Sequence, residues 1–446
     1  MPFTTPAELA RDLHSKLDTQ IQATVAPDQV AELLEVLFVA SMQTDEGRFA
    51  VVHVAYLNPA TLQPSSGYVA IDRYEFVPLD APISLSARSL TSLASATDPR
   101  TSSVVVYPDH TGLLKCHGLL DQGHAYHEFL TFEREELVER PGVFHVAALA
   151  PGRIAYYIGY SSTGELRAGE RITPPLSVLW RPGPVFASLR IAIGRFVAAA
   201  KADAPSEIQS EWDTLTFLPD GNANFVNYIA SSWLMGLCRL LLRVRGQRHG
   251  GALFLAPSVP VDGVGIKHSL RYDRLARAHR SRAVELGREL VSRRRLWGSG
   301  PLDQTPASRT DFATYLVAVN RGREALSAIT GAIWFIALLT RVDGCVVATP
   351  DLEVAGFGGV IEGTEASPNV WRASDVAATE ASLVQVDSSR FGTRHRSMIA
   401  LCGRVPGGIG FVVSQDGDVR AIAKVGERVV IWENVSLLVN ESFGKP

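Results

Sequence analysis

Apolar residues recur at helical spacing in the first forty residues of the chain. Leu9, Leu13 and Leu17 stand four residues apart, and a second leucine-rich repeat follows Pro27. This spacing gathers apolar side chains on one helix face, and proline is favoured in the first turn of a helix. We therefore expect two helices within residues 6–42.

The hydrophobic period changes from residue 49 onward. Runs of β-branched and aromatic residues are separated by Gly, Pro, Asp and Asn, as expected of strands joined by turns. The runs are FAVVHVAYLNP, SSVVVYPDHTGLLKCHGLL, GVFHVAALAPGRIAYYIGY and GELRAGERI. With the two helices before them, they predict an α+β domain over residues 1–180.

A domain boundary is predicted where four prolines fall within ITPPLSVLWRPGPVF, because they exclude a continuous helix or central strand. Beyond it the pattern is helical to about residue 244. Short apolar strands (GGALFLAP, GCVVAT and IGFVVSQ) then alternate with an arginine-rich helix and an apolar helix ending near Thr340. This order predicts an α/β layer domain over residues 181–446.

Composition narrows the possible functions. The chain has 446 residues, enough for two or three domains with their own cores. Its 43 Lys and Arg against 46 Asp and Glu give a net charge of -3, so any anion site must be local. The cysteines are far apart and show no CxxC spacing, which favours reduced, packed thiols over disulfides or a zinc site. They are Cys116, Cys238, Cys345 and Cys402.

The N-terminus has neither the apolar region nor the cleavage site of a secretion signal, so we expect a cytoplasmic protein. Two apolar stretches require comment. FVNYIASSWLMGLCRLLLRVR is interrupted by Arg239, and residues 325–340 fall short of the roughly 20 residues that a membrane span needs. We predict that both are buried core helices and that the protein has no membrane partner.

The segment RYDRLARAHRSRAVELGRELVSRRRLWG contains nine arginines and three acids. We prefer to interpret it as a helix with a solvated face that turns Leu275, Leu286 and Leu290 to the core. The alternative is an RNA-binding protein, whose affinity would fall steeply with salt. The chain shows no recognised nucleic-acid-binding fold, so nucleic acid is not an expected partner.

Two stretches of the second half place polar or glycine residues at the end of an apolar strand, where α/β sheets often bind ligands. In RHGGALFLAPS, paired glycines would let the backbone approach a ligand closely, although an ordinary buried strand also fits. In RVDGCVVATPDLEVAGFGG, Asp343 and Gly344 precede a strand. Asp343 is either a turn former or a carboxylate that holds Mg²⁺ or Mn²⁺ for phosphoryl or nucleotidyl transfer.

A third stretch, SSRFGTRHRSMIALCG, sets several phosphate-binding side chains before an apolar run. Gly392 permits an unusual backbone, Thr393 offers a hydroxyl, and Arg394 has a fork of donors that matches phosphate oxygens. His395 and Arg396 can add positive charge. If the run that follows begins a helix, its free N–H groups strengthen the anion site. A surface turn with solvated charges is the alternative.

The order of these stretches resembles the diadenylate cyclase domain of the DisA_N type, which condenses two ATP into cyclic di-AMP. The family signature is a GALI-like strand, a DGA motif, a GTRHR(A/S)A motif and a VSE-type strand end. Here these are Gly251–Phe254, Asp343–Cys345, Gly392–Ser397 and Val412–Asp416. The resemblance covers about 200 residues, and it implies a mixed β-sheet flanked by helices.

The resemblance also implies roles for individual residues. Asp343 would bind the catalytic Mg²⁺ or Mn²⁺ and help activate the 3′-hydroxyl of ATP, with Gly344 close to the nucleotide. Arg394 and His395 would act on the phosphates in catalysis, and Asp416 could supply a second metal ligand. The implied ATP-binding residues are Gly251, Ala252, Leu253, Cys345, Gly392, Thr393, Arg396 and Ser414. Catalysis would require two facing protomers, hence a homodimer or a higher homo-oligomer.

The chain departs from the family pattern at several positions. Val342 stands where many members have a histidine, Cys345 where they have alanine, and Gln415 where they have an acid. The segment GTEASPNVWRASDVAATEAS lengthens the interval between the second and third motifs. A catalytically inactive nucleotide sensor of the same fold therefore stays open as the alternative function.

The N-terminal region resembles the sensor module called DACNV, which precedes such cyclase domains in some bacteria. The resemblance rests on SMQTDEGRF, LASATDPRTSSVVVYPDHTGLLKCHGLLDQG and RPGVFHV. The ligand of this module is not identified by the sequence. His117, His124 and His127 lack a familiar metal-ligand spacing, so we interpret them as strand and turn histidines.

Overall fold

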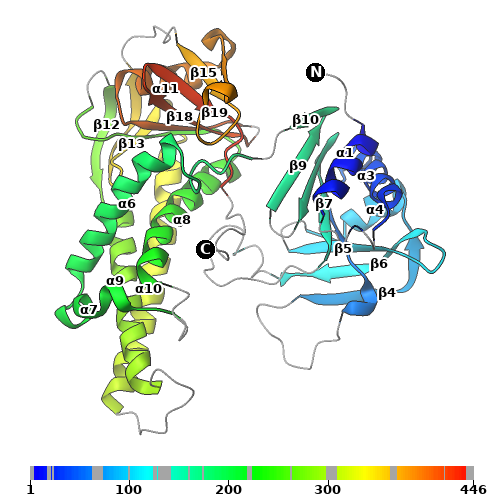
Figure 1. Cartoon of the computed structure of the whole chain (residues 1–446), viewed down its shortest axis with the longest axis horizontal. Helices are drawn as coiled ribbons and strands as arrows, with labels where there is room; N and C mark the ends of the chain where they lie inside the picture. Colours follow the sequence, from blue (N-terminus) through cyan, green and yellow to red (C-terminus); the bar gives the residue numbers. More distant parts are fainter. Residues whose placement is uncertain are drawn as a thin grey trace. The chain divides into compact units, whose positions relative to one another are not determined.

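The computed structural model divides the chain into two compact units, and each is described by itself (Figure 1). Unit 1 comprises Met1–Pro175 with Leu438–Pro446, and unit 2 comprises Leu176–Leu437. The structure describes residues 5–17, 22, 25–62, 74–98, 101–123, 128, 142–158, 161–172, 175–217, 224–261, 264–297, 309–361, 369–415 and 417–437.

Unit 1 is built on a mixed sheet with the strand order β10-β9-β8-β7-β3-β5-β6-β4. Strands β3 and β5 are parallel, while β3 and β7, like β5 and β6, are antiparallel. The strands are β3 (Val52–Tyr56), β4 (Glu75–Ser84), β5 (Ser102–Pro108), β6 (Leu114–Asp121), β7 (Phe144–Ala150), β8 (Arg153–Ile158), β9 (Ser161–Arg167) and β10 (Glu170–Ile172). A separate short hairpin joins β1 (Thr44–Asp45) to β2 (Arg48–Phe49). The strands predicted for this region are confirmed.

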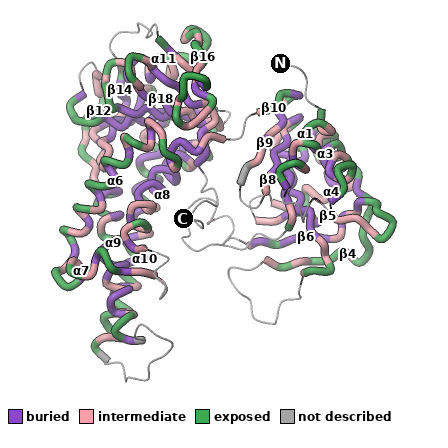
Figure 2. The backbone as a smooth tube through the Cα atoms, in the orientation of Figure 1, coloured by how far each residue is buried: buried purple, intermediate pink, exposed green. Residues whose placement is uncertain are grey.

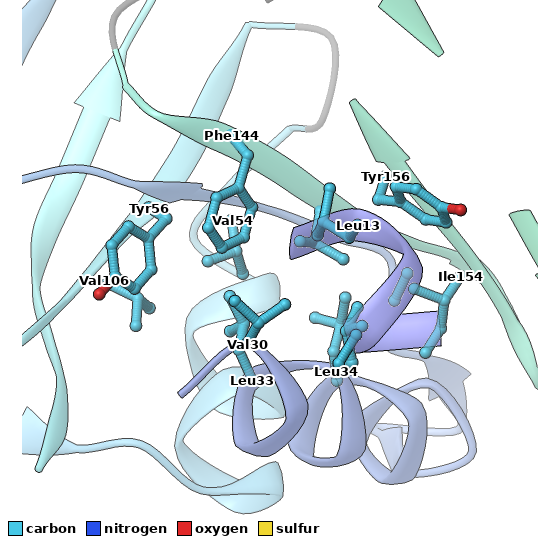
Figure 3. Close-up of a cluster of buried hydrophobic side chains, with 14 of the residues drawn as sticks. Leu13, Val30, Leu33, Leu34, Val54, Tyr56, Val106, Phe144, Ile154 and Tyr156 are labelled. Carbon is cyan, nitrogen blue, oxygen red and sulfur yellow. The ribbon is translucent and has the colours of Figure 1, made fainter. Parts of the chain in front are cut away.

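Helices α1 (Pro6–Lys16), α3 (Pro27–Ser41) and α4 (Ala87–Ala94) contribute to the core of unit 1. Helix α1 begins with a capping box, in which the Thr5 side chain accepts a hydrogen bond from the Glu8 backbone N–H. Figure 3 shows helix side chains packed toward the strands, with Leu13, Val30, Leu33 and Leu34 against Val54, Tyr56, Phe144 and Ile154. The two predicted N-terminal helices are therefore confirmed, and their leucine stripes are buried.

A network of charges joins α1 to the sheet of unit 1. Asp12 Oδ2 accepts hydrogen bonds from Lys16 Nζ at 2.8 Å and Tyr156 Oη at 2.7 Å, and it lies 2.6 Å from Arg171 Nη2. Burial alone would raise the pKa of Asp12, but the hydrogen bonds from Lys16, Tyr156 and Arg171 outweigh burial and lower this pKa to about 2. Asp12 is therefore ionised at neutral pH, and its carboxylate is bound by Lys16, Tyr156 and Arg171.

Unit 2 is built on a nine-stranded mixed sheet within its described residues, with the order β12-β14-β13-β11-β17-β18-β19-β15-β16. Strand β11 is parallel to β13 and antiparallel to β17. The strands are β11 (Gly251–Leu255), β12 (Val264–Tyr272), β13 (Cys345–Ala348), β14 (Val354–Ile361), β15 (Val370–Ala373), β16 (Leu383–Gln385), β17 (Ile409–Val413), β18 (Val419–Val425) and β19 (Arg428–Trp432). This mixed sheet with helices confirms the α/β class.

Strands β11, β13 and β17 at the centre of the unit 2 sheet are buried along their whole length, so both faces of the sheet are covered there (Figure 2). One face packs against α11, where Ala252 and Phe254 meet Met398 and Cys402. Helices α6, α8 and α10 contact strands β18, β17 and β14 respectively. The helices are α6 (Pro184–Asp203), α7 (Ser206–Glu211), α8 (Phe225–Gly246), α9 (Arg274–Trp297), α10 (Arg309–Leu339) and α11 (Thr393–Arg404).

The arginine-rich segment forms α9, and its leucines are buried as predicted: Leu275, Leu286 and Leu290 are at most 4 % exposed. Several of its arginines pair with acids on α6 and α7. These ion pairs are Arg280–Asp203, Arg294–Glu211 and Arg295–Glu207. These arginines thus hold neighbouring helices of the unit to one another.

Helices α8 and α10 are long and apolar enough, by length and composition alone, to cross a membrane. Core helices of soluble proteins pass the same test. Most of the apolar stretch of α8 is buried, and the Arg239 guanidinium donates to Thr330 Oγ1 on α10 at 2.6 Å. Helix α10 is more exposed than expected of a core helix, because Phe312, Trp334 and Leu338 are each about half exposed.

The lengthened interval between the second and third motifs adds structure to the sheet edge. Its described part forms β15, which pairs in parallel with β19, and a turn that leads into β16. All four cysteines of the chain are buried and free, as predicted.

Candidate functional site

A pocket of about 330 Å³ in unit 2 gathers residues from the three predicted motifs. It lies between the turn before β13, strands β11, β12 and β14, and the first turns of α11. The lining residues are Ala252, Lys267, Asp343, Gly344, Cys345, Gly359, Val360, Thr393, Arg394, Ser397 and Met398. Stretches almost 150 residues apart in the sequence thus meet at one site.

The Asp343-Gly344 turn has a conformation that requires glycine. Gly344 has a φ of +107°, and a Cβ there would lie 2.6 Å from the Gly359 carbonyl oxygen. Close packing on β14 therefore fixes the turn, and Asp343 precedes it with an exposed side chain. Among the described residues, Asp343 has no hydrogen-bond or ion-pair partner. Its carboxylate is available to a ligand.

The GTRHR motif forms the start of helix α11, as the sequence predicted. Gly392 occupies the N-cap position and provides no side-chain cap. The N–H groups of the first turn therefore remain available, and the helix dipole favours an anion there. Thr393 and Arg394, the first two helical residues, line the pocket. The site combines a helix N-terminus with a guanidinium, a combination suited to phosphate.

The helical phase divides the residues of this motif between two environments. Thr393 and Ser397 are one turn apart, as are Arg394 and Met398, and all four line the pocket. His395 and Arg396 are not lining residues, and Arg396 is exposed. His395 therefore lies outside the pocket lining, because a helix directs consecutive side chains about 100° apart.

His395 makes its contacts outside the pocket lining. Its Nε2 lies 2.8 Å from Arg420 Nη1, and its ring stacks on Phe391 with centroids 5.9 Å apart. Burial, together with the charges of Arg420 and Arg394, lowers the pKa of His395 to about 4. The expected positive charge at His395 is therefore absent at neutral pH. Since arginine only donates, Nε2 accepts and the ring proton sits on Nδ1.

The paired glycines of RHGGALF serve different purposes. Gly250 has a φ of +74°, and a Cβ on it would lie 2.8 Å from Arg394 Nη1. Its missing side chain makes room for the Arg394 guanidinium. Gly251 instead packs against Val244 and Thr340, where a Cβ would lie 2.6 Å and 2.7 Å away.

Strand parity separates the predicted ATP-binding residues of β11. Ala252 lines the pocket, whereas Gly251 and Leu253 point to the opposite face of the sheet. Of these three predicted ATP-binding residues, Ala252 is the one whose side chain lines the pocket. Cys345 pairs beside Ala252 and also lines the pocket. Burial raises the pKa of the Cys345 thiol to about 12, so the thiol stays protonated and unreactive in the pocket wall.

Several residues that line the pocket were not predicted from the sequence. Lys267 comes from β12, an edge strand of mixed polar character that we did not recognise, and it is exposed. Gly359 and Val360 come from β14, and Ser397 lies within the GTRHR helix. Lys267 has no hydrogen-bond or ion-pair partner in the part of the chain that the structure describes. It adds a second cation to the pocket.

The predicted residues at the end of β17 lie outside the pocket lining. Ser414 closes the turn between β17 and β18, where its Oγ accepts a hydrogen bond from the Asp418 N–H at 3.1 Å. Gln415 is exposed. Asp416, the second predicted metal ligand, lies outside the described residues.

The pocket lies at the amino ends of the parallel strands β11 and β13. Open α/β sheets usually bind ligands at the carboxyl ends of their strands. Here β17 runs antiparallel to β11 and ends at the same edge, where Gly251 is paired with Val413. The mixed sheet thus brings strand starts, a strand end and a helix N-terminus to one place.

The donor set of the pocket suits a metal ion that arrives with a phosphate ligand. Among the described residues, no group of three or more His, Cys, Asp and Glu side chains could hold an ion. Asp343 is the carboxylate in the pocket lining. Mg²⁺ commonly uses one or two protein carboxylates and takes its other oxygen ligands from phosphates and water, so a single exposed aspartate fits it.

In unit 1, His117 behaves as a strand histidine, because its Nε2 lies 3.1 Å from the Tyr107 carbonyl oxygen. His124 and His127 lie outside the described residues. The interpretation of His117 as structural therefore agrees with its contacts.

Comparison with known protein families identifies the N-terminal module. Residues 19–121 match the family model described as "Probable sensor domain DACNV". The match falls within unit 1 and spans α3 to β6, so the predicted sensor module is confirmed over this range. Searches of curated proteins and of solved structures gave no match.

Proposed function

We propose that unit 2 is a diadenylate cyclase, which condenses two ATP into cyclic di-AMP and releases two pyrophosphates. The observation that carries this proposal is the pocket in which the Asp343 turn meets the N-terminus of α11, with Arg394 and Lys267 both in its lining. A size of about 330 Å³ lies within the range of small-molecule sites. The DACNV match supports it, because that module precedes such cyclase domains.

The residues of the pocket suit phosphoryl transfer, which depends mainly on positioning and on charge stabilisation. Each 3′-hydroxyl would attack the α-phosphorus of the other ATP, forming a phosphodiester while the bond to pyrophosphate breaks. Arg394 and the N–H groups of α11 would hold the phosphate oxygens. Lys267 would offset the charge that develops on the leaving pyrophosphate.

Asp343 would hold Mg²⁺ or Mn²⁺, which when bound neutralises phosphate charge and lowers the pKa of a coordinated hydroxyl. As a carboxylate, Asp343 can also accept the proton of the attacking 3′-hydroxyl. One pocket accommodates one nucleotide in this proposal, so two pockets from two protomers must face each other. A homodimer or larger homo-oligomer is therefore part of the proposal.

A catalytically inactive nucleotide sensor is the second candidate. It is favoured by the surroundings of Asp343, because the neighbouring Val342 is 37 % exposed and offers no metal ligand. Gln415 likewise replaces an acid. This candidate keeps the phosphate-binding end of α11 but makes no product.

Incubation of the purified full chain with labelled ATP and either Mg²⁺ or Mn²⁺ separates the two candidates. The cyclase forms cyclic di-AMP and pyrophosphate in a one-to-two ratio. The sensor binds ATP in calorimetry without forming either. A chain that neither binds ATP nor forms product would contradict both candidates.

A further inference from the structure

His395 connects the phosphate-binding end of α11 to a chain of charged residues on the sheet. It directly follows Thr393 and Arg394, and its Nε2 accepts a hydrogen bond from Arg420 on β18. Arg420 Nε lies 3.5 Å from Glu433 Oε1, an ion pair whose geometry does not make a hydrogen bond. The other oxygen of Glu433 lies 3.5 Å from Arg372 Nη1. The side chain of Arg420 is only 20 % exposed.

Glu433 stands immediately before the place where the chain passes between the two units. Leu176 N–H donates to the Asn434 carbonyl at 2.9 Å, and Ser436 N–H donates to the Leu176 carbonyl at 2.9 Å. Val435 N–H donates to the Val419 carbonyl at 2.8 Å, next to Arg420 in β18.

We call this set of backbone hydrogen bonds between Leu176 and residues 434–436 the junction. The chain passes between the two units on either side of it. The chain enters unit 2 at Leu176 and leaves it after Leu437. The two crossings are joined by the bridge between Leu176 and Val435. This bridge lies two residues from Glu433, so a change passed along the chain from unit 1 would meet unit 2 here.

We propose that Arg420 and Glu433 are positioning residues for the phosphate-binding end of α11, and that they relay the state of the Leu176–Val435 junction to that site. This proposal rests on the proposed function of unit 2, and it names the route by which the sensor module would control the site. Arg420 acts through His395. It fixes the orientation of the His395 ring and thereby the first turn of α11, which places Arg394 in the pocket lining.

Exchange of Arg420 tests the positioning role in the full chain. R420M keeps much of the side-chain length but removes the hydrogen bond to His395 and the ion pair with Glu433. We expect ATP affinity and product formation to fall about two- to tenfold. The pKa of His395 should rise from about 4 toward its usual range, because one of the charges that lower it is lost.

The His395 pKa is followed by NMR, with H395Q to assign the signal. This readout distinguishes positioning from simple destabilisation, since a merely loosened fold would lower the melting temperature without a selective change at this ring. E433Q, a milder change, should lower ATP affinity in the same direction. R428M serves as the matched control, because Arg428, on β19 of the same sheet, forms an ion pair with Glu380 and has no contact with His395 among the described residues.

The junction is tested with L176P, which removes the N–H that donates to Asn434. We expect it to weaken ATP binding by about twofold in the parent chain and to have no further effect in the R420M background. If the two effects add, the junction does not act through Arg420. If R420M binds ATP as the parent does, the positioning role is wrong.

These outcomes are independent of whether the chain makes cyclic di-AMP. ATP affinity and the His395 pKa report on positioning even in a chain without turnover. Loss of cyclase activity in the parent would therefore overturn the proposed function alone, while unchanged affinity in R420M would overturn the positioning proposal alone.

Discussion

The charge network around Asp12 in unit 1 and the charges of the unit 2 pocket are used in opposite ways. In unit 1, Asp12 is engaged by Lys16, Tyr156 and Arg171, and its pKa lies near 2. In the pocket of unit 2, Asp343 and Lys267 have no partner among the described residues. A charge that is fully paired within the fold contributes to stability, whereas a charge left unpaired beside a pocket is available to a ligand. Substitution of Asp12 should therefore affect stability, whereas substitution of the pocket charges should affect function.

The largest effect is expected for Asp343→Asn, which keeps the size of the side chain but removes its charge. Turnover should fall by about a hundredfold or more, the scale of a lost transition-state stabiliser, while ATP still binds. The measurements are product formation and calorimetry on the same preparation. Asp351→Asn, just beyond the other end of β13, is the matched control. Full turnover by D343N would remove Asp343 from the chemistry.

Sequence motifs could predict which segments meet at the site, but not which of their side chains face it. The order of the Asp343, Arg394 and Ala252 motifs indicated a common site because the motifs matched a family pattern. His395 lies outside the pocket lining because its direction depends on the phase of α11, and Leu253 does so because strand parity turns it to the other face of the sheet.

Lys267 could not be found from motifs at all. Strand β12 lies at a sheet edge and carries mixed polar residues, so no hydrophobic alternation marked it. Its place beside the pocket is set by pairing with β14, a contact between segments about 90 residues apart. Local pattern predicts elements such as β11, β13 and β17, whereas long-range pairing decides which edge residues reach a site.

Arg394→Ala should affect binding as well as chemistry. The guanidinium contacts phosphate before and during the reaction in the proposed function, so its loss should weaken ATP binding by about 1.5–3 kcal/mol, roughly ten- to a hundredfold. Arg396→Ala provides a sharp comparison, since Arg396 is exposed on the same turn but does not line the pocket. Equal losses in the two variants would contradict the helical phase described here.

In unit 1 the expected effect of Asp12→Asn is on stability. Loss of the carboxylate leaves Lys16 and Arg171 without their shared anion, and unfolding of unit 1 should become easier by about 1–2 kcal/mol. Chemical denaturation followed by a probe in unit 1 measures this. Asp80→Asn is the control, because Asp80 is exposed and has no partner among the described residues. A D12N chain as stable as D80N would contradict the assignment.

The same network predicts a pH dependence with a definite sign. The pKa of Asp12 is about 2 in the folded chain and 3.8 for an unperturbed aspartate, as in the unfolded chain, so the unfolded state takes up the proton first on acidification. The stabilisation is complete above about pH 4 and is lost as the pH falls toward 2. In D12N this part of the acid sensitivity should disappear, which a denaturation series across that window would detect.

Among the pocket residues, the smallest functional effect is expected for Lys267→Met, which keeps the aliphatic length and removes the charge. Lys267 stands on an exposed edge strand, where water screens its interaction with phosphate, so ATP affinity should fall about three- to tenfold. Pyrophosphate binding should weaken in parallel, while adenosine binding should not change, because adenosine carries no phosphate. Lys424→Met on β18 of the same sheet controls for the loss of a surface cation.

If K267M weakens adenosine and ATP binding equally, Lys267 shapes the pocket and does not contact phosphate. If neither changes, the unpaired lysine beside the pocket is a surface residue, and the contrast between the two units rests on Asp343 and Arg394.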